Sequence, residues 1–278
     1  MSKLLLAIVL AATLVVGSGA RAQTYDLILR NARIVDGTGS PWYRADIGIR
    51  GDTIARIAPT ITVPATRVID LGDLIASPGF IDLHTHALRG LFDAPTADNY
   101  VRQGVTMVMV GPDGSGSVVP DGMPNDAKLK PLLDRLNALP KSLNIGSFIG
   151  QGAVREAVIG LAKRQPTPAE LERMRELVRQ AMIDGAFGLS TGLFYVPGAF
   201  TPLSEVVELQ KVVAPFRGVH TSHMRDEATG VVEAVNETIA IGDPCWPGST
   251  WCFGLTEALQ TAFYRAFCRA AYRQLEIL

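Results

Sequence analysis

The sequence predicts an α/β protein in which a short β-rich segment precedes a larger region of alternating strands and helices. Residues 25–75 alternate apolar and polar side chains between turn residues, which is typical of strands. Residues 76–242 alternate short apolar runs with helix-like segments, which indicates a parallel sheet, either open or closed into a (β/α) barrel. The chain has 278 residues, of which 47% are hydrophobic, so it can bury a sizeable core.

Residues 23–75 are predicted to form two β-hairpins. The first turns at Asp36-Gly37 and the second at Gly51-Asp52, where the strand-like alternation is interrupted by residues that favour tight turns.

Residues 76–242 are predicted to contain about five barrel strands, because about five apolar runs are separated by helical segments. The best-marked helix follows Thr167, which is expected to be the N-cap. Pro168 would stand at the first helical position, Glu170 would complete a capping box, and Gly185 would end the helix.

The N-terminal residues 1–22 read as a secretory signal peptide. A short basic start precedes an apolar stretch that is too short to span a bilayer comfortably, and Ala20-Arg21-Ala22 resembles a cleavage site. We therefore expect an exported protein, periplasmic or secreted, with no stable membrane anchor after cleavage; an uncleaved anchor is the alternative. The net charge of −1 argues against a nucleic-acid partner.

Two of the four histidines, His84 and His86, stand one residue apart after an apolar run. Residues i and i+2 of a strand point to the same face, so both imidazoles would project together from the end of the first barrel strand. A divalent metal ion is the usual reason to bring two imidazoles together, and we interpret the pair as metal ligands. The alternative is two polar residues in a loop.

Three motifs together resemble those of one enzyme family. The segment SPGFIDLHTH, residues 77–86, resembles the first-strand metal motif of the amidohydrolase superfamily. STGLFYVPG, residues 190–198, and SHMRDE, residues 222–227, resemble a narrower branch, the N-acyl-D-amino-acid deacylases or D-aminoacylases. The resemblance extends from about Tyr25 to Gly242, and it implies a metal-dependent (β/α)8 TIM-barrel amidohydrolase fold with a small N-terminal β-sandwich portion.

The resemblance implies a site with one or two zinc ions. His84 and His86 match paired ligands, and His223 matches a ligand from the fifth strand. Asp113 takes the place of a bridging cysteine of the family; a carboxylate can also ligate zinc, although Pro112-Asp113-Gly114 could be only a turn. His220 matches no ligand position and is expected to be a partly buried strand residue.

Two further residues are candidates for a catalytic role. Tyr195 matches a residue near the scissile amide, as an oxyanion donor or substrate contact. Arg225, beside His223, could orient that ligand or meet a substrate carboxylate, although a surface ion pair is equally compatible. The implied reaction is metal-assisted hydrolysis of a linear amide in a small N-acyl amino acid, with a carboxylate of the last barrel strand as general base.

The resemblance also raises expectations about where the chain departs from the family. The sixth-strand histidine and the eighth-strand aspartate of the family have no counterpart, so we expect an incomplete barrel, truncated or frameshifted after Gly242. Residues 243–278 form an atypical tail that contains all three cysteines and is compatible with an amphipathic helix. That tail could instead be a dimerisation helix, so oligomers are also an expectation.

Two alternative functions follow from the same residues. A truncated chain could be a non-enzymatic product or a pseudo-enzyme that binds metal weakly. A cyclic amidase, similar to hydantoinase or dihydroorotase, would keep the fold and change the substrate. The absence of a lysine from the fourth predicted strand, GLSTGLFY, counts against that reading, since those enzymes usually bridge their metals with a modified lysine.

Overall fold

The computed structural model describes residues 24–115 and 128–242, which fall into two compact units. The described part of the first unit is residues 24–78, and that of the second is residues 79–115 with 128–242. The expectations for residues 1–22 and for the tail 243–278 lie outside the described residues. Within the described part, no helix is both long and apolar enough to cross a membrane.

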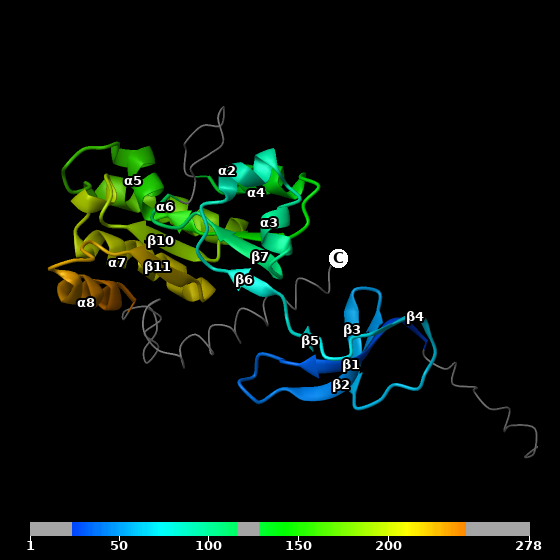
Figure 1. Ribbon diagram of the computed structural model, residues 1–278. Helices are drawn as coiled ribbons and strands as arrows, with labels where there is room; N and C mark the ends of the chain where they lie inside the picture. The colour runs from blue at the N-terminus through cyan, green and yellow to red at the C-terminus, as the bar shows by residue number, and fades with distance from the viewer. Residues whose placement is uncertain (1–23, 116–127, 243–278) are drawn as a thin grey trace, which may run out of the picture. The chain divides into compact units, whose positions relative to one another are not determined.

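The first unit is a single sheet with the strand order β3-β2-β1-β4, and β5 also pairs with β1 (Figure 1). The strands are β1 (Tyr25–Ile34), β2 (Tyr43–Arg50), β3 (Thr53–Ala58), β4 (Ala65–Asp70) and β5 (Ile75–Ala76). Both predicted hairpin pairings form, because β1 pairs antiparallel with β2, and β2 antiparallel with β3. The second turns at Gly51-Asp52 as predicted, whereas residues 35–42 join β1 to β2 in a longer loop than the turn expected at Asp36-Gly37. β4 and β5 then return parallel to β1.

A buried carboxylate joins β1 to the segment that follows β3. Asp46 of β2 is only 4% exposed. Its two oxygens accept hydrogen bonds from the backbone N–H groups of Asn31, at 3.0 Å, and Ile61, at 2.9 Å. Asn31 stands at a shift in the β1–β2 register with φ at +58°, so the bond to Asp46 satisfies a backbone donor that the irregular ladder leaves without a strand partner.

The second unit contains parallel strands, as predicted. The described strands are β6 (Phe80–Asp82), β7 (Val105–Val110), β8 (Asn144–Ser147), β9 (Ile149–Gly150), β10 (Gly188–Gly192) and β11 (Val219–His223). They pair in the orders β6-β7-β8 and β9-β10-β11. β8 and β9 are parts of one run interrupted at Phe148, and the Phe187 N–H donates to Ser147 O at 2.9 Å, which links the two sheets.

Counting β8 and β9 as one run, the described residues form five successive parallel barrel strands. This confirms the predicted number and the (β/α) class. β6 and β11 are the outermost strands in the described part, so these five strands form an incomplete barrel.

Helices pack along the parallel strands (Figure 1). They are α2 (Leu88–Asp93), α3 (Asp98–Val101), α4 (Lys130–Asn137), α5 (Gln151–Ile159), α6 (Pro168–Asp184), α7 (Leu203–Val213) and α8 (Val231–Gly242), with short 3-10 turns at Gly198–Phe200 and Ala214–Phe216. The largest core cluster joins Met174 and Val178 of α6 to Val206 of α7 and Leu189 of β10. This apolar layer holds the parallel strands, and the loops after these strands carry the candidate site described below.

The start of α6 is as predicted. Thr167 Oγ1 accepts the N–H of Glu170, and the Glu170 carboxylate accepts the Thr167 N–H at 2.7 Å, which completes the capping box. The helix ends at Gly185, whose φ of +111° is in the left-handed region. The helix α3 is short, because Gly104, at φ +80°, turns the chain into β7 soon after it.

Candidate metal centre

His84 and His86 lie in the loop that follows β6, and both side chains are exposed, by 56% and 65%. Thr85 between them is buried, and its hydroxyl lies 2.6 Å from the Tyr100 hydroxyl. The Thr85 N–H also bonds to Met109 O of β7, so the extended alternation of the strand continues through the loop. One residue therefore points into the core, and its two neighbours point out together.

Asp113 meets both histidines from the loop after β7. Its Oδ2 lies 3.4 Å from His84 Nε2 and 3.1 Å from His86 Nε2, and its side chain is only 11% exposed. Its Oδ1 is buried without a hydrogen-bond partner. The residue adopts a φ of +56°, so the turn and the ligand interpretations of Pro112-Asp113-Gly114 are compatible: a turn presents the carboxylate.

These three side chains can hold a metal ion. Their ligand atoms all lie within 4.8 Å of one another. Two ligands bound about 2.0–2.1 Å from a tetrahedral zinc ion would be about 3.3 Å apart, which is close to the Asp113–histidine distances. Two imidazoles and a carboxylate are donors that suit zinc, and the unpaired Oδ1 shows that the carboxylate is not satisfied within the fold.

His223, at the end of β11, is not a member of this three-residue group. Its Nδ1 lies 3.3 Å from the Tyr195 hydroxyl, and the two rings are 4.6 Å apart between centroids. Its Nε2 lies 3.7 Å from Glu227 Oε1. The structure thus brings His84, His86 and Asp113 together, and it pairs His223 with Tyr195; the ligand role of His223 stays a prediction.

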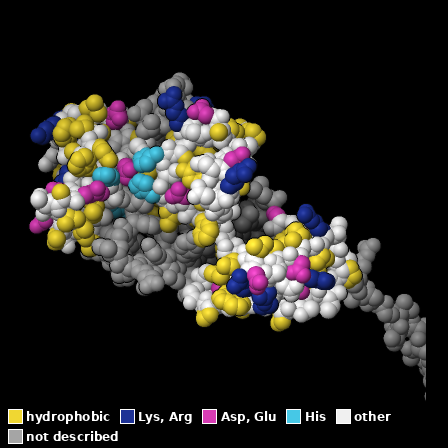
Figure 2. All heavy atoms as spheres, viewed as in Figure 1, with side chains coloured by type: hydrophobic (Ala, Val, Ile, Leu, Met, Phe, Trp, Pro, Cys, Tyr) yellow, Lys and Arg dark blue, Asp and Glu magenta, His cyan; other side chains and the backbone are white. Residues whose placement is uncertain are grey.

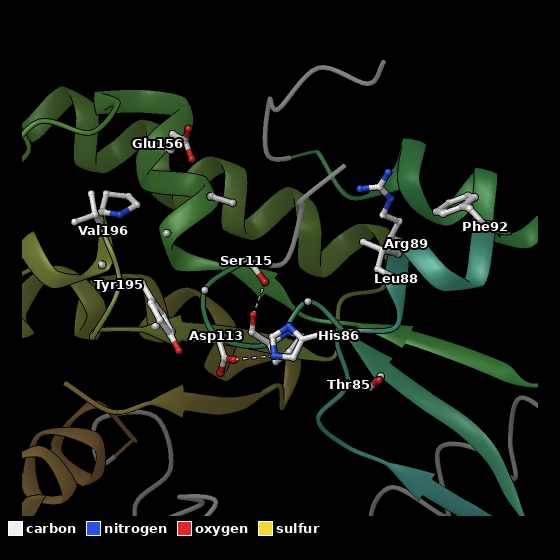
Figure 3. Close-up of a pocket in the computed structure, with 18 of the residues that line it drawn as sticks. Thr85, His86, Leu88, Arg89, Phe92, Asp113, Ser115, Glu156, Tyr195 and Val196 are labelled. Atoms are coloured by element: carbon white, nitrogen blue, oxygen red, sulfur yellow. Dashed lines mark hydrogen bonds and ion pairs between the residues drawn. The ribbon is translucent and has the colours of Figure 1, made fainter. Parts of the chain in front are cut away.

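A cavity of about 820 Å³ lies beside this part of the structure. His86, Asp113 and Tyr195 all line it, and the Tyr195 hydroxyl points toward Asp113 (Figure 3). Leu88, Phe92 and other apolar side chains form part of the wall. Figure 2 shows histidine side chains gathered at the surface of this unit beside an acidic side chain. A small polar molecule with an apolar group would fit this lining.

Arg225 is engaged within the fold. Its Nε and Nη2 form two bonds to the Glu237 carboxylate at 2.9 and 2.8 Å, while Nη1 and Nη2 donate to Ala199 O and Thr201 O. Both carbonyls belong to the segment that follows Tyr195. The guanidinium therefore holds this segment against α8, and a direct catalytic role stays a prediction.

His220 is buried in β11, as expected of a strand residue that is not a ligand. Its Nε2 lies 3.0 Å from Thr191 Oγ1, and its Nδ1 has no partner. Burial lowers the pKa of His220 to about 4, because the charged imidazolium loses its hydration.

A buried polar network beside the site had no signal in the sequence. Arg155 of α5 is fully buried and forms an ion pair with Glu205 of α7. Gln151 is also buried and donates to Thr201 and Glu205, whereas its neighbour Gly152 lines the cavity. Spacing cannot reveal such a pair, since Arg155 and Glu205 are 50 positions apart in the sequence.

Known proteins resemble this chain over most of its length. A D-aminoacylase of Alcaligenes xylosoxydans xylosoxydans is 34% identical over 240 residues, which are 81% of this chain and 49% of that protein. An N-acyl-D-glutamate deacylase of the same organism is 34% identical over 230 residues, or 78% and 47% of the two chains. The chain is a homologue of the D-aminoacylases. It spans about half the length of these curated relatives. No protein-family profile matches it.

Solved structures of D-aminoacylases and related deacylases share the fold. An N-acyl-D-glutamate deacylase from Bordetella bronchiseptica, complexed with zinc and a phosphonate inhibitor, is 31% identical with a TM-score of 0.74 over 89% of this chain and 57% of that one. A D-aminoacylase with a binuclear metal centre is 34% identical with a TM-score of 0.73 over 78% and 49%. The amidohydrolase fold expected from the sequence is therefore confirmed.

Proposed function

We propose that this chain carries the metal-binding part of a zinc-dependent amidohydrolase that removes the acyl group from N-acyl-D-amino acids. The observation that carries the proposal is the group formed by His84, His86 and Asp113 at a cavity that Tyr195 also lines. The homology to D-aminoacylases over 81% of the chain supports the substrate class. The reaction is hydrolysis of a linear carbon–nitrogen bond outside a peptide chain.

The chain's residues have separable roles in this proposal. The two imidazoles and the Asp113 carboxylate would hold a zinc ion, which when bound polarises a carbonyl and acidifies a water molecule. The Tyr195 hydroxyl, 3.3 Å from His223 Nδ1, is placed to donate a hydrogen bond to the amide oxygen as negative charge develops on it. His223 orients that hydroxyl, or binds a second ion. No described residue matches the general-base carboxylate of the last barrel strand that the resemblance implies.

The cavity supports a small substrate with a polar amide and an apolar group. Leu88, Phe92 and Val196 provide apolar surface, whereas Asp113 and the Tyr195 hydroxyl are polar groups near the histidines. An N-acyl amino acid has this distribution, with its amide between two substituents. A cyclic amidase is less well supported, because β10 has no lysine in GLSTG.

Metal content and turnover test the proposal together. The full-length chain is titrated with zinc and assayed on N-acetyl-D-amino acids. Asp113→Asn should lower zinc affinity and abolish turnover, whereas Asp134→Asn, a change in an exposed ion pair on α4, should alter neither. Failure of the native chain to bind zinc stoichiometrically would refute the proposal. Zinc binding without turnover would limit it to a metal-binding protein, the alternative of a pseudo-enzyme.

We also propose that the chain is exported to the periplasm or beyond, with no nucleic-acid partner and no stable membrane anchor after cleavage. The basic and apolar start of the sequence supports this. Cell fractionation with N-terminal sequencing tests it: mature protein beginning at Gln23 outside the cytoplasm is expected, and full-length protein in the cytoplasm would contradict it.

Self-association of the chain remains a proposal, which light scattering of the purified chain would test.

A further inference from the structure

The loop that carries Asp113 has three residues in the left-handed region of backbone conformation. Gly111, Asp113 and Gly114 have φ values of +76°, +56° and +74°. Glycine adopts such values readily, whereas an aspartate adopts them at some cost, which contacts with its surroundings offset. Something outside the loop therefore fixes the direction of the carboxylate.

A single buried hydroxyl joins the two ends of this loop. Ser190 lies in the middle of β10 and is fully buried. Its Oγ donates to Gly111 O at 2.6 Å and accepts the N–H of Gly114 at 3.2 Å. The hydroxyl thus contacts the residues on either side of Pro112-Asp113, and both of its hydrogen bonds are made to the loop rather than to its own strand.

Close backbone contact completes the arrangement. A Cβ atom added to Gly192, two residues after Ser190, would lie 2.2 Å from Asp113 O. One added to Gly114 would lie 2.9 Å from Gly192 N. The loop therefore rests directly on the backbone of β10, and Ser190 supplies the hydrogen bonds at this contact.

We propose that Ser190 is a positioning residue for the Asp113 carboxylate. By joining Gly111 O to Gly114 N, it holds the left-handed turn in the one orientation that brings Asp113 Oδ2 within reach of both imidazoles. The inference rests on the proposed metal-binding function, and it adds a residue that is remote in sequence and does not touch the metal. Partners that orient a ligand commonly change metal affinity by about 10- to 100-fold when they are removed.

Ser147→Ala is a matched control for Ser190→Ala. Ser147 is also a buried strand serine, 1% exposed, but its hydroxyl donates to Phe148 O at 3.0 Å, the carbonyl of its own neighbour. Both variants lose one buried hydroxyl from the parallel sheet. Only Ser190→Ala removes bonds to the Asp113 loop, so a general loss of stability should affect the two alike.

Two measurements on the full-length chain test the proposal. The first is hydrogen–deuterium exchange of metal-free protein, in peptides that cover residues 105–115. Ser190→Ala should raise exchange at the Gly114 amide by about three- to tenfold, the range expected for a lost net hydrogen bond, and Ser147→Ala should not. The second is the zinc dissociation constant, which Ser190→Ala should raise by about 10- to 100-fold and Ser147→Ala by less than about threefold.

The outcomes separate this proposal from the proposed function. Unchanged exchange in Ser190→Ala overturns the positioning role, whatever the zinc affinity. Faster exchange with native zinc affinity also overturns it, while the metal-binding function stands. Faster exchange in a chain whose native form takes up no zinc supports the hydroxyl bridge and refutes the proposed function.

Discussion

The buried imidazole of His220 should make the stability of the fold depend on pH. Burial lowers its pKa from 6.5 to about 4, so the folded chain resists protonation that the unfolded chain accepts. As the pH falls below about 6.5, the unfolded state therefore binds more protons than the folded state and is favoured. The stabilising contribution is complete above that pH and is lost progressively as the pH falls toward the folded pKa.

The magnitude follows from the shift. The pKa of His220 is 6.5 in the unfolded chain and about 4 in the folded chain. At about 1.4 kcal/mol per unit, linkage gives a loss of about 2 kcal/mol in the free energy of unfolding between about pH 7 and pH 4.5. The variant His220→Leu removes the titrating group and its unpaired Nδ1, and Thr191 keeps its bond to Ser222.

Urea denaturation followed by circular dichroism measures this difference. The native chain and His220→Leu are compared at the two pH values in the presence of a chelator, so that metal binding does not contribute. The native chain should lose about 2 kcal/mol more than the variant between the two pH values. An equal loss in both would show that His220 is not buried in the neutral form, and the reasoning would be refuted.

Three further variants test other contacts. Glu205→Gln leaves the fully buried Arg155 without its charged partner and should cost about 3–5 kcal/mol in urea denaturation; a loss below about 1 kcal/mol would contradict a buried ion pair. Thr167→Ala removes the N-cap of α6 and should cost about 1 kcal/mol by thermal unfolding, with Thr167→Ser restoring most of it. Gly192→Ala should displace Asp113 and weaken zinc binding in calorimetry; native affinity would show that the loop is not packed on β10.

The fold was predictable where local signals act alone. The capping box at Thr167 involves residues three positions apart, and the two N-terminal hairpins are set by turn residues between alternating strands. The parallel strands followed from apolar runs between helices. The helix α3 has only four residues, because Gly104 lies directly before β7 and leaves no room for a longer helix.

The site was predictable only in part. The His84-x-His86 spacing defines one face of an extended segment, so the pair could be found without a structure. Asp113 was named as a ligand only through the resemblance, because its approach to the two histidines depends on a left-handed turn and on contact with β10 that residue spacing does not reveal. Arg225 was interpreted from its neighbour in the chain, but its bonds reach Ala199, Thr201 and Glu237, which only tertiary packing brings near.

The most direct test of the central claim is the ligand environment of zinc bound to the full-length chain, measured by X-ray absorption at the zinc edge. Two imidazole nitrogens at about 2.0–2.1 Å and carboxylate oxygen are expected, with one imidazole lost in His84→Ala. The chain also contains three cysteines, all after residue 243. Sulfur at about 2.3 Å, or a spectrum that His84→Ala leaves unchanged, would contradict a metal centre built on His84, His86 and Asp113.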